Sequence, residues 1–110
     1  MTRVVPFLRV ADAEAAATWY ARLGFEIEWR HRFEPDLPLF VSIRNGDGSI
    51  FLSEHGGDAR PDTLLYLYVD DVDEVARNFD AEVAEAEYGM REVQLTDPDG
   101  NRLRIGAPLS

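Results

Sequence analysis

The side chains that most often act as nucleophiles or metal ligands are sparse in this chain. Cysteine is absent, which excludes thiol catalysis, zinc–thiolate sites and disulfide bonds. The two histidines, His31 and His55, are 24 residues apart, and together with Glu54 they form no recognisable metal-binding spacing. We therefore expect a surface His31 and a loop His55. The serines of the central segment sit in no nucleophile-elbow pattern: Ser42, Ser49 and Ser53.

Aromatic side chains are the other group that could do chemistry, and they make up 11% of the chain. In a strand at residues 64–69, alternation places Tyr66 and Tyr68 on one face and Leu65 and Leu67 on the other. Flat aromatic faces stack on planar rings and attract cations. The pattern favours recognition of a small aromatic molecule, although two tyrosines on a strand are also ordinary strand residues.

The charge balance restricts the partners. The chain has 110 residues with 21 acidic against 11 basic side chains, which gives a net charge of -10. This charge makes nucleic acid an unsuitable partner and attracts cationic small molecules. With 45% hydrophobic residues the chain can build one core, so we expect a single domain over residues 1–110. No apolar run reaches the roughly 20 residues of a membrane span, and the first residues lack a signal-peptide pattern. We therefore expect no membrane partner and a cytoplasmic location.

Local signals predict a strand–helix–strand–strand–strand order in the first half. Asp12 is a good N-cap, Gly24 ends the helix, and residues 45–48 read Asn-Gly-Asp-Gly, a hairpin turn. Alternation in the second strand predicts Phe25, Ile27, Trp29, His31 and Phe33 on one face. The expected elements are a helix at 13–23 and strands at 4–10, 25–33, 39–44 and 50–54.

The second half repeats this order. Asp71 caps the second helix, and Glu74 follows three residues later. The expected elements are a helix at 72–79 and strands at 64–69, 82–88, 91–96 and 102–105. The repeat predicts an α+β fold of two βαβββ modules, about 3–54 and about 62–106, whose mixed sheets form half-open clefts.

The order of the motifs resembles the vicinal oxygen chelate superfamily over roughly residues 4–106. This superfamily includes glyoxalase I, extradiol dioxygenases, fosfomycin-resistance enzymes and bleomycin-resistance proteins. The segments at 5–8, 63–69 and 88–92 look most like the bleomycin-resistance proteins. Those relatives are acidic homodimers that bind a cationic antibiotic without reacting with it. The segments that carry the superfamily resemblance are 10–12, 19–25, 69–72, 89–92 and 97–101.

The resemblance also implies where enzymes of the superfamily hold a divalent metal. The four corresponding positions carry Val5, Phe51, Leu64 and Arg104. Three of these side chains have no donor atom and the fourth is a cation, so none is a useful ligand. We therefore expect no metal, no cofactor and no catalytic residue.

The predicted function is metal-free binding of an aromatic, cationic antibiotic or natural product in the cleft of a homodimer. The alternative is a divergent glyoxalase- or dioxygenase-type enzyme that uses Arg104 or Glu92 in place of the metal, and a third interpretation is a regulatory or carrier domain without a tight ligand. Glu54 is a further candidate carboxylate for an amine. The candidate ligand-binding residues are Tyr66, Tyr68, Tyr88, Phe7, Trp29, Phe33, Phe51, Glu92 and Arg104.

Overall fold

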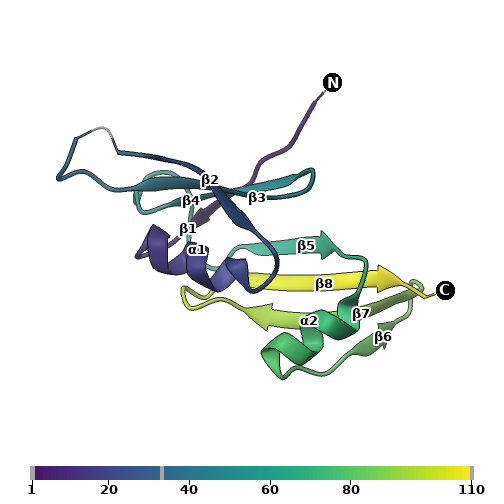
Figure 1. The fold of residues 1–110 in the computed structure, drawn as a ribbon. Coiled ribbons are helices and arrows are strands. Elements are labelled where there is room, and N and C mark those ends of the chain that lie inside the picture. The colour runs from purple at the N-terminus through teal and green to yellow at the C-terminus, as the bar shows by residue number, and fades with distance from the viewer. Residues whose placement is uncertain (1, 33, 110) are drawn as a thin grey trace. The chain divides into compact units, whose positions relative to one another are not determined.

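The chain folds into two compact units, Met1–Thr63 and Leu64–Ser110. The computed structural model describes residues 2–32 and 34–109. Each unit contains one βαβββ module built around a four-stranded mixed sheet, as Figure 1 shows. The predicted α+β class and the internal duplication are therefore confirmed. No helix among the described residues has both the length and the apolar character that crossing a membrane requires.

The sheet of the first unit has the strand order β1-β4-β3-β2. Its first strand pairs parallel to its last, and the other neighbours are antiparallel. The first strand is shorter than the predicted 4–10. Pro6 has no N–H to give to the sheet, although its carbonyl accepts the Phe51 N–H at 2.9 Å. The elements are β1 (Phe7–Arg9), α1 (Ala13–Ala21), β2 (Glu26–His31), β3 (Phe40–Asn45) and β4 (Gly48–Ser53).

The sheet of the second unit has the matching order β5-β8-β7-β6. The turn before its last strand is held by Asp97, whose carboxylate accepts the backbone N–H groups of Asp99 and Asn101, both at 2.9 Å. The weak predicted strand at 82–88 is reduced to three residues. The elements are β5 (Leu64–Tyr68), α2 (Val72–Phe79), β6 (Ala84–Ala86), β7 (Met90–Thr96) and β8 (Arg102–Pro108).

The pleat of the first sheet separates two kinds of side chain. Helix α1 contacts β2, β3 and β4, and the side chains on that face are aliphatic and fully buried, among them Leu8, Val41, Ile43 and Leu52. Leu52 lies opposite both Leu8 and Val41 in the register. Because successive side chains alternate between the faces, the intervening residues of these strands lie on the face away from α1.

The predicted caps are present at both helices. Asp12 accepts the Ala15 N–H at 3.1 Å, and Asp71 accepts the Glu74 N–H at 3.1 Å. Each carboxylate satisfies a backbone donor that the first helical turn leaves open, and its charge suits the positive end of the helix dipole. Helix α2 ends at Asp80, which adopts the left-handed conformation.

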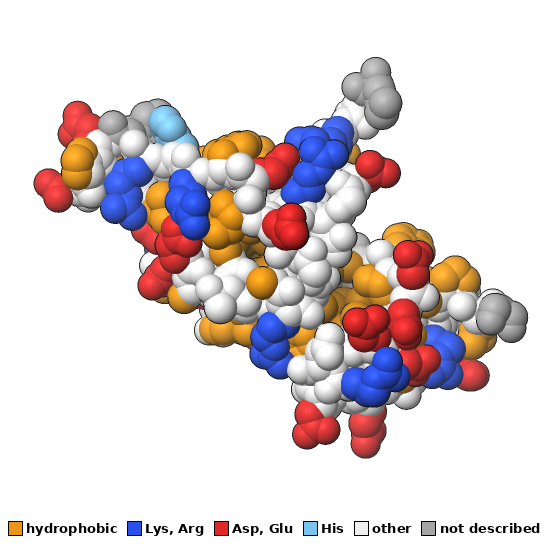
Figure 2. Space-filling model, in the orientation of Figure 1, with side chains coloured by type: hydrophobic (Ala, Val, Ile, Leu, Met, Phe, Trp, Pro, Cys, Tyr) orange, Lys and Arg blue, Asp and Glu red, His pale blue; other side chains and the backbone are white. Residues whose placement is uncertain are grey.

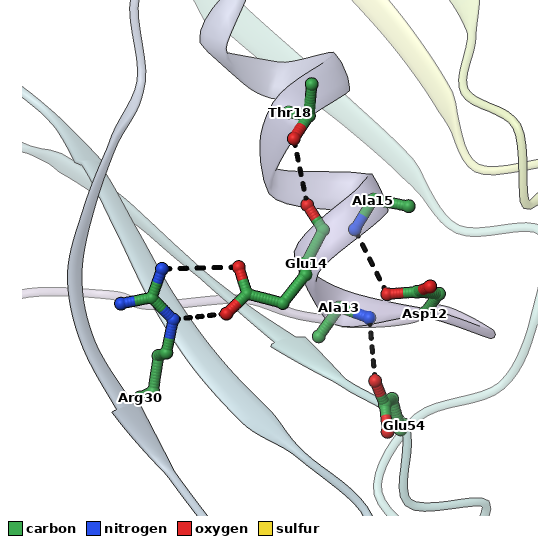
Figure 3. Close-up of polar contacts among 7 residues, drawn as sticks. All are labelled: Asp12, Ala13, Glu14, Ala15, Thr18, Arg30 and Glu54. Carbon is green, nitrogen blue, oxygen red and sulfur yellow. Dashed lines mark hydrogen bonds and ion pairs between the residues drawn. The ribbon is translucent and has the colours of Figure 1, made fainter.

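A β-bulge in β2 overturns the predicted face of Trp29. Ile27 lies opposite Ile43, and Trp29 lies opposite Ser42, so Glu28 is the extra residue. The inserted residue reverses the alternation, and the side chains of Ile27 and Trp29 lie on opposite faces. Arg30 accordingly faces α1, where it pairs with Glu14 (Figure 3). Phe33, at the end of the predicted strand, lies outside the described residues.

Glu54 has a structural role in this unit, which weakens the prediction that it serves as a cleft carboxylate. One oxygen accepts the Ala13 N–H at 2.8 Å, the contact drawn in Figure 3, and the other accepts the Leu39 N–H at 3.0 Å. The side chain thus joins the start of α1 to the chain that enters β3. Both carboxylate oxygens are occupied by backbone donors.

Replacement of Glu54 by alanine should leave both N–H groups without their acceptor. We expect Glu54→Ala to lower the free energy of unfolding by about 1–3 kcal/mol, measured by urea denaturation. Glu26→Ala is the control, because Glu26 is exposed on β2, and its effect should stay within about 0.5 kcal/mol. Equal stability of the two variants would contradict the role assigned to Glu54.

Candidate functional site

Four aromatic rings gather on the face of the first sheet that points away from α1. A cross-strand row runs from Phe7 to Phe51, then Ser42 and Trp29. The ring centroids of Phe7 and Phe51 are 5.2 Å apart, and those of Trp29 and Phe51 are 5.4 Å apart. Phe40 completes the group, which we call the aromatic cluster: Phe7, Trp29, Phe40 and Phe51.

Phe40 is a member that the sequence analysis missed. Its ring lies 5.0 Å from that of Phe51, 5.5 Å from Phe7 and 5.3 Å from Trp29, measured between centroids. The sequence could have indicated Phe40, because alternation within residues 39–44 sets Phe40 and Ser42 on one face and Val41 on the other. Phe7 is 39% exposed and Trp29 is 42% exposed, so the cluster is partly open to solvent and is not a closed core.

A carboxylate lies beside the aromatic cluster. The hydroxyl of Ser42 donates to Glu28 at 2.9 Å, and Arg44 lies 3.4 Å from the same carboxylate. These contacts lower the pKa of Glu28, chiefly through the Ser42 hydrogen bond. Because Ser42 lies between Phe51 and Trp29 in the row, the bulge places an ionised carboxylate, paired with Arg44, on the side of the sheet that carries the rings.

A pocket of about 440 Å³ adjoins the aromatic cluster and shares Phe7 and Phe40 with it. Its volume lies within the range of about 300–1,000 Å³ typical of small-molecule sites. Most of the wall is apolar, and the polar residues come from the end of β4 and the loop after it. The lining residues are Phe7, Leu37, Pro38, Leu39, Phe40, Ser53, His55 and Asp58.

In the second unit, two tyrosines share one carboxylate. The Tyr66 hydroxyl donates to Glu92 Oε2 at 2.7 Å, and the Tyr88 hydroxyl donates to the same oxygen. The rings of Tyr66 and Tyr68 lie 5.0 Å apart between centroids. Glu92 is buried, whereas Tyr68 and Tyr88 are exposed. Three predicted ligand-binding residues, Tyr66, Tyr88 and Glu92, are thus brought together in a hydrogen-bonded group, which we call the tyrosine–glutamate cluster.

Gly106 makes this cluster possible. It lies in the register between Tyr68 on β5 and Glu92 on β7. A Cβ atom at Gly106 would collide with the Tyr66 hydroxyl and would press against Glu92 Cγ and the Arg91 carbonyl, each at 3.2 Å. A glycine therefore lets the Tyr66 side chain cross β8 to reach Glu92. No local pattern in the sequence indicates this role of Gly106.

The electrostatics of the cluster keep the proton on the phenol. Hydrogen bonds from Tyr88 and Tyr66 lower the pKa of Glu92, and the positive charge of Arg104 acts in the same direction. Burial and the hydrogen bond to Glu92 raise the pKa of Tyr66, and the hydrogen bond to Glu92 raises that of Tyr88. A weakly basic carboxylate and weakly acidic phenols are poorly suited to general acid–base catalysis near neutral pH. The cluster holds the Tyr66 ring in place.

The predicted ligand-binding residues thus divide between the two units. Phe7, Trp29 and Phe51 belong to the first, and the tyrosines, Glu92 and Arg104 belong to the second. The proposed use of Glu92 as the partner of an amine is weakened, because two phenols occupy one of its oxygens. The expectation that residues of both units line one cleft stays a prediction.

The four residues that the resemblance assigns to the metal positions of the superfamily do not fit a metal. Phe51 contacts the rings of Phe7 and Trp29, and Arg104 brings a positive charge to its module. Val5 and Leu64 have no donor atom. Within residues 2–32 and 34–109, no group of three or more His, Cys, Asp or Glu side chains is arranged to hold a metal ion.

Comparison with protein families now identifies the chain. The sequence model of the family described as "Glyoxalase superfamily protein" matches residues 1–108. The chain belongs to the glyoxalase superfamily. This match confirms the resemblance inferred from the motifs. A comparison with curated proteins gives no match.

Solved structures show the same fold at low sequence identity. A bleomycin resistance determinant encoded on the transposon Tn5 is 22% identical, with a TM-score of 0.77 and 98% of each chain covered. TioX from Micromonospora sp. ML1 is 18% identical, with a TM-score of 0.78 and coverage of 99% of this chain and 100% of TioX. A bleomycin-binding protein complexed with bleomycin is 23% identical, with a TM-score of 0.70 and coverage of 97% and 98%. At these identities the likeness establishes the fold of this glyoxalase-superfamily protein.

The raised pKa of Tyr66 predicts a loss of stability at alkaline pH. The folded state holds this proton more tightly than the unfolded chain, so the stabilisation is complete below the ordinary tyrosine pKa of about 10 and is lost as the pH rises through the raised value. Free energies of unfolding measured between about pH 8 and 12 should fall less steeply for Tyr66→Phe than for the parent. Gly106→Ala, which displaces the hydroxyl, should reduce the slope in the same way. Identical slopes in all three proteins would refute the assignment.

Proposed function

We propose that this protein binds an aromatic, cationic antibiotic or natural product without a metal and without chemical change, in the manner of a resistance protein. The observation that carries the proposal is the aromatic cluster, in which Phe7 and Trp29 stay partly exposed on one side of a sheet. Stacking on such faces suits planar heteroaromatic rings. The ring centroids of Trp29 and Phe51 are 5.4 Å apart, which supports contact of one planar ligand with both rings.

Charge supports a cationic ligand. The chain carries a net charge of -10, and Figure 2 shows acidic side chains spread over the surface with hydrophobic side chains exposed between them. The electron-rich faces of the rings act in the same direction over short distances. A solved structure with this fold is that of a bleomycin-binding protein complexed with bleomycin, which supports the same class of ligand here.

The alternative of a divergent enzyme of the superfamily stays a prediction. It requires Glu92 or Arg104 to replace the metal. The lowered pKa of Glu92 makes that carboxylate a weak base. We therefore favour binding over catalysis.

The role of the aromatic cluster is tested by replacing Trp29. A thermal-shift screen of bleomycin-type and other cationic natural products, with EDTA present, should yield a ligand that raises the melting temperature. Trp29→Ala should weaken its binding by on the order of 1–3 kcal/mol, measured by calorimetry. Trp19→Ala is the matched control, because Trp19 lies on α1 and that helix packs on the other face. Undiminished binding by Trp29→Ala, or binding that requires a metal, would count against the proposal.

We also propose that the binding form is a cytoplasmic homodimer. Each module offers one open sheet of four strands, and a second copy would supply further walls for the cleft. Light scattering at micromolar concentration should give about twice the 12.4 kDa of one chain. A mass near that of a single chain would rule the dimer out.

A further inference from the structure

The polar wall of the pocket in the first unit contains a carboxylate with a defined orientation. The Ser53 hydroxyl, which is fully buried, donates to Asp58 Oδ2 at 2.6 Å. The same hydroxyl oxygen accepts the His55 N–H at 3.1 Å, and the Asp58 N–H donates to the His55 carbonyl at 3.2 Å. This local network fixes Asp58 at the edge of an otherwise apolar pocket.

The second oxygen of Asp58 is not satisfied by His55. His55 Nδ1 accepts the Gly57 N–H at 3.2 Å, so in this arrangement Nδ1 has no proton to donate to Asp58. The Nδ1 atom lies 3.8 Å from Asp58 Oδ1. This distance is too long for a hydrogen bond, and both atoms act as acceptors here. Within the part of the chain that the structure describes, Asp58 Oδ1 accepts no hydrogen bond from a neighbouring group.

A carboxylate oxygen with open acceptor capacity at the edge of an apolar pocket favours a particular ligand chemistry. Its charge attracts a cation, and its lone pairs need an N–H donor. The apolar wall of Leu37, Pro38, Leu39 and Phe40 suits a hydrophobic or aromatic body. The Asp58 side chain is 36% exposed, so a ligand can reach it.

We propose that this pocket binds the ammonium end of a small aromatic amine, with a primary or secondary ammonium donating to Asp58 Oδ1 and the ring lying against the apolar wall. Ser53 acts as a positioning residue for the carboxylate. The inference rests on the proposed ligand-binding function and assigns the place at which the cationic group of the ligand is recognised.

The test compares two probes of nearly equal shape. Tryptamine carries a primary ammonium, and tryptophol replaces it with a neutral hydroxyl. Calorimetry or NMR titration of the parent protein should show tryptamine binding about tenfold or more tightly than tryptophol, as expected for a hydrogen bond to a charged group. Asp58→Asn should remove this preference while leaving the affinity for tryptophol unchanged.

Asp47→Asn is the matched control. It changes the net charge by the same amount, and Asp47 lies in the turn between β3 and β4, outside the pocket lining. This variant should keep the preference for tryptamine. A loss of preference in Asp47→Asn equal to that in Asp58→Asn would show a general charge effect and overturn the proposal.

The two proposals fail in different ways. Equal binding of tryptamine and tryptophol by the parent protein would overturn the role of Asp58 and leave aromatic binding intact. Absence of binding for both probes would overturn the pocket as a site for aromatic amines, while the Trp29 experiment would still decide whether the aromatic cluster binds other ligands. If Asp58→Asn fails to fold, equal binding of the two probes by the parent protein would still overturn the role of Asp58.

Discussion

In each module, the parallel pairing of the first strand with the fourth sets which side chains of these two strands lie opposite each other. In the first unit it sets Phe7 opposite Phe51, and in the second it sets Tyr66 opposite Arg104. These are equivalent positions of the duplicated βαβββ order. Once this register is set, alternation assigns the aliphatic side chains to the face against the helix and the remaining side chains to the open face. Both candidate surfaces follow from the same backbone constraint.

The elements themselves could be predicted because their signals are local. Asp12 and Asp71 cap helices through hydrogen bonds that span three residues. The bulge at Glu28 could not be predicted in this way. It depends on which residue of β3 lies opposite β2, and nothing in the alternation of residues 25–33 shows an extra residue. The prediction of a strand at residues 25–33 was therefore correct, but the prediction that Trp29 shares a face with Ile27 was wrong.

Individual site residues were harder to assign than the fold, because their roles depend on distant partners. Glu54 is a plausible ligand carboxylate in sequence, but it accepts backbone N–H groups from Ala13 and Leu39. Glu92 was predicted to bind the ligand. Its two tyrosine partners and the space left by Gly106 come from three different strands or turns. A single sequence shows no periodic pattern from which a distant backbone donor or an empty space between strands could be predicted.

The two modules carry chemically different side chains at the positions where the resemblance predicts metal donors. At the equivalent fourth-strand positions, the first module has Phe51 within a group of rings, and the second has Arg104 near an ionised Glu92. A ring surface gains affinity mainly by burying apolar area and by attracting cations, and these forces tolerate many planar ligands. Discrimination among such ligands must then come from the few polar groups at the edges. In the first unit those groups are Glu28, which Ser42 holds beside the rings, and Asp58, which Ser53 holds at the pocket. A serine hydroxyl donates to the carboxylate in both cases, and under the proposed function this sheet face would combine broad aromatic recognition with a directional preference for cations.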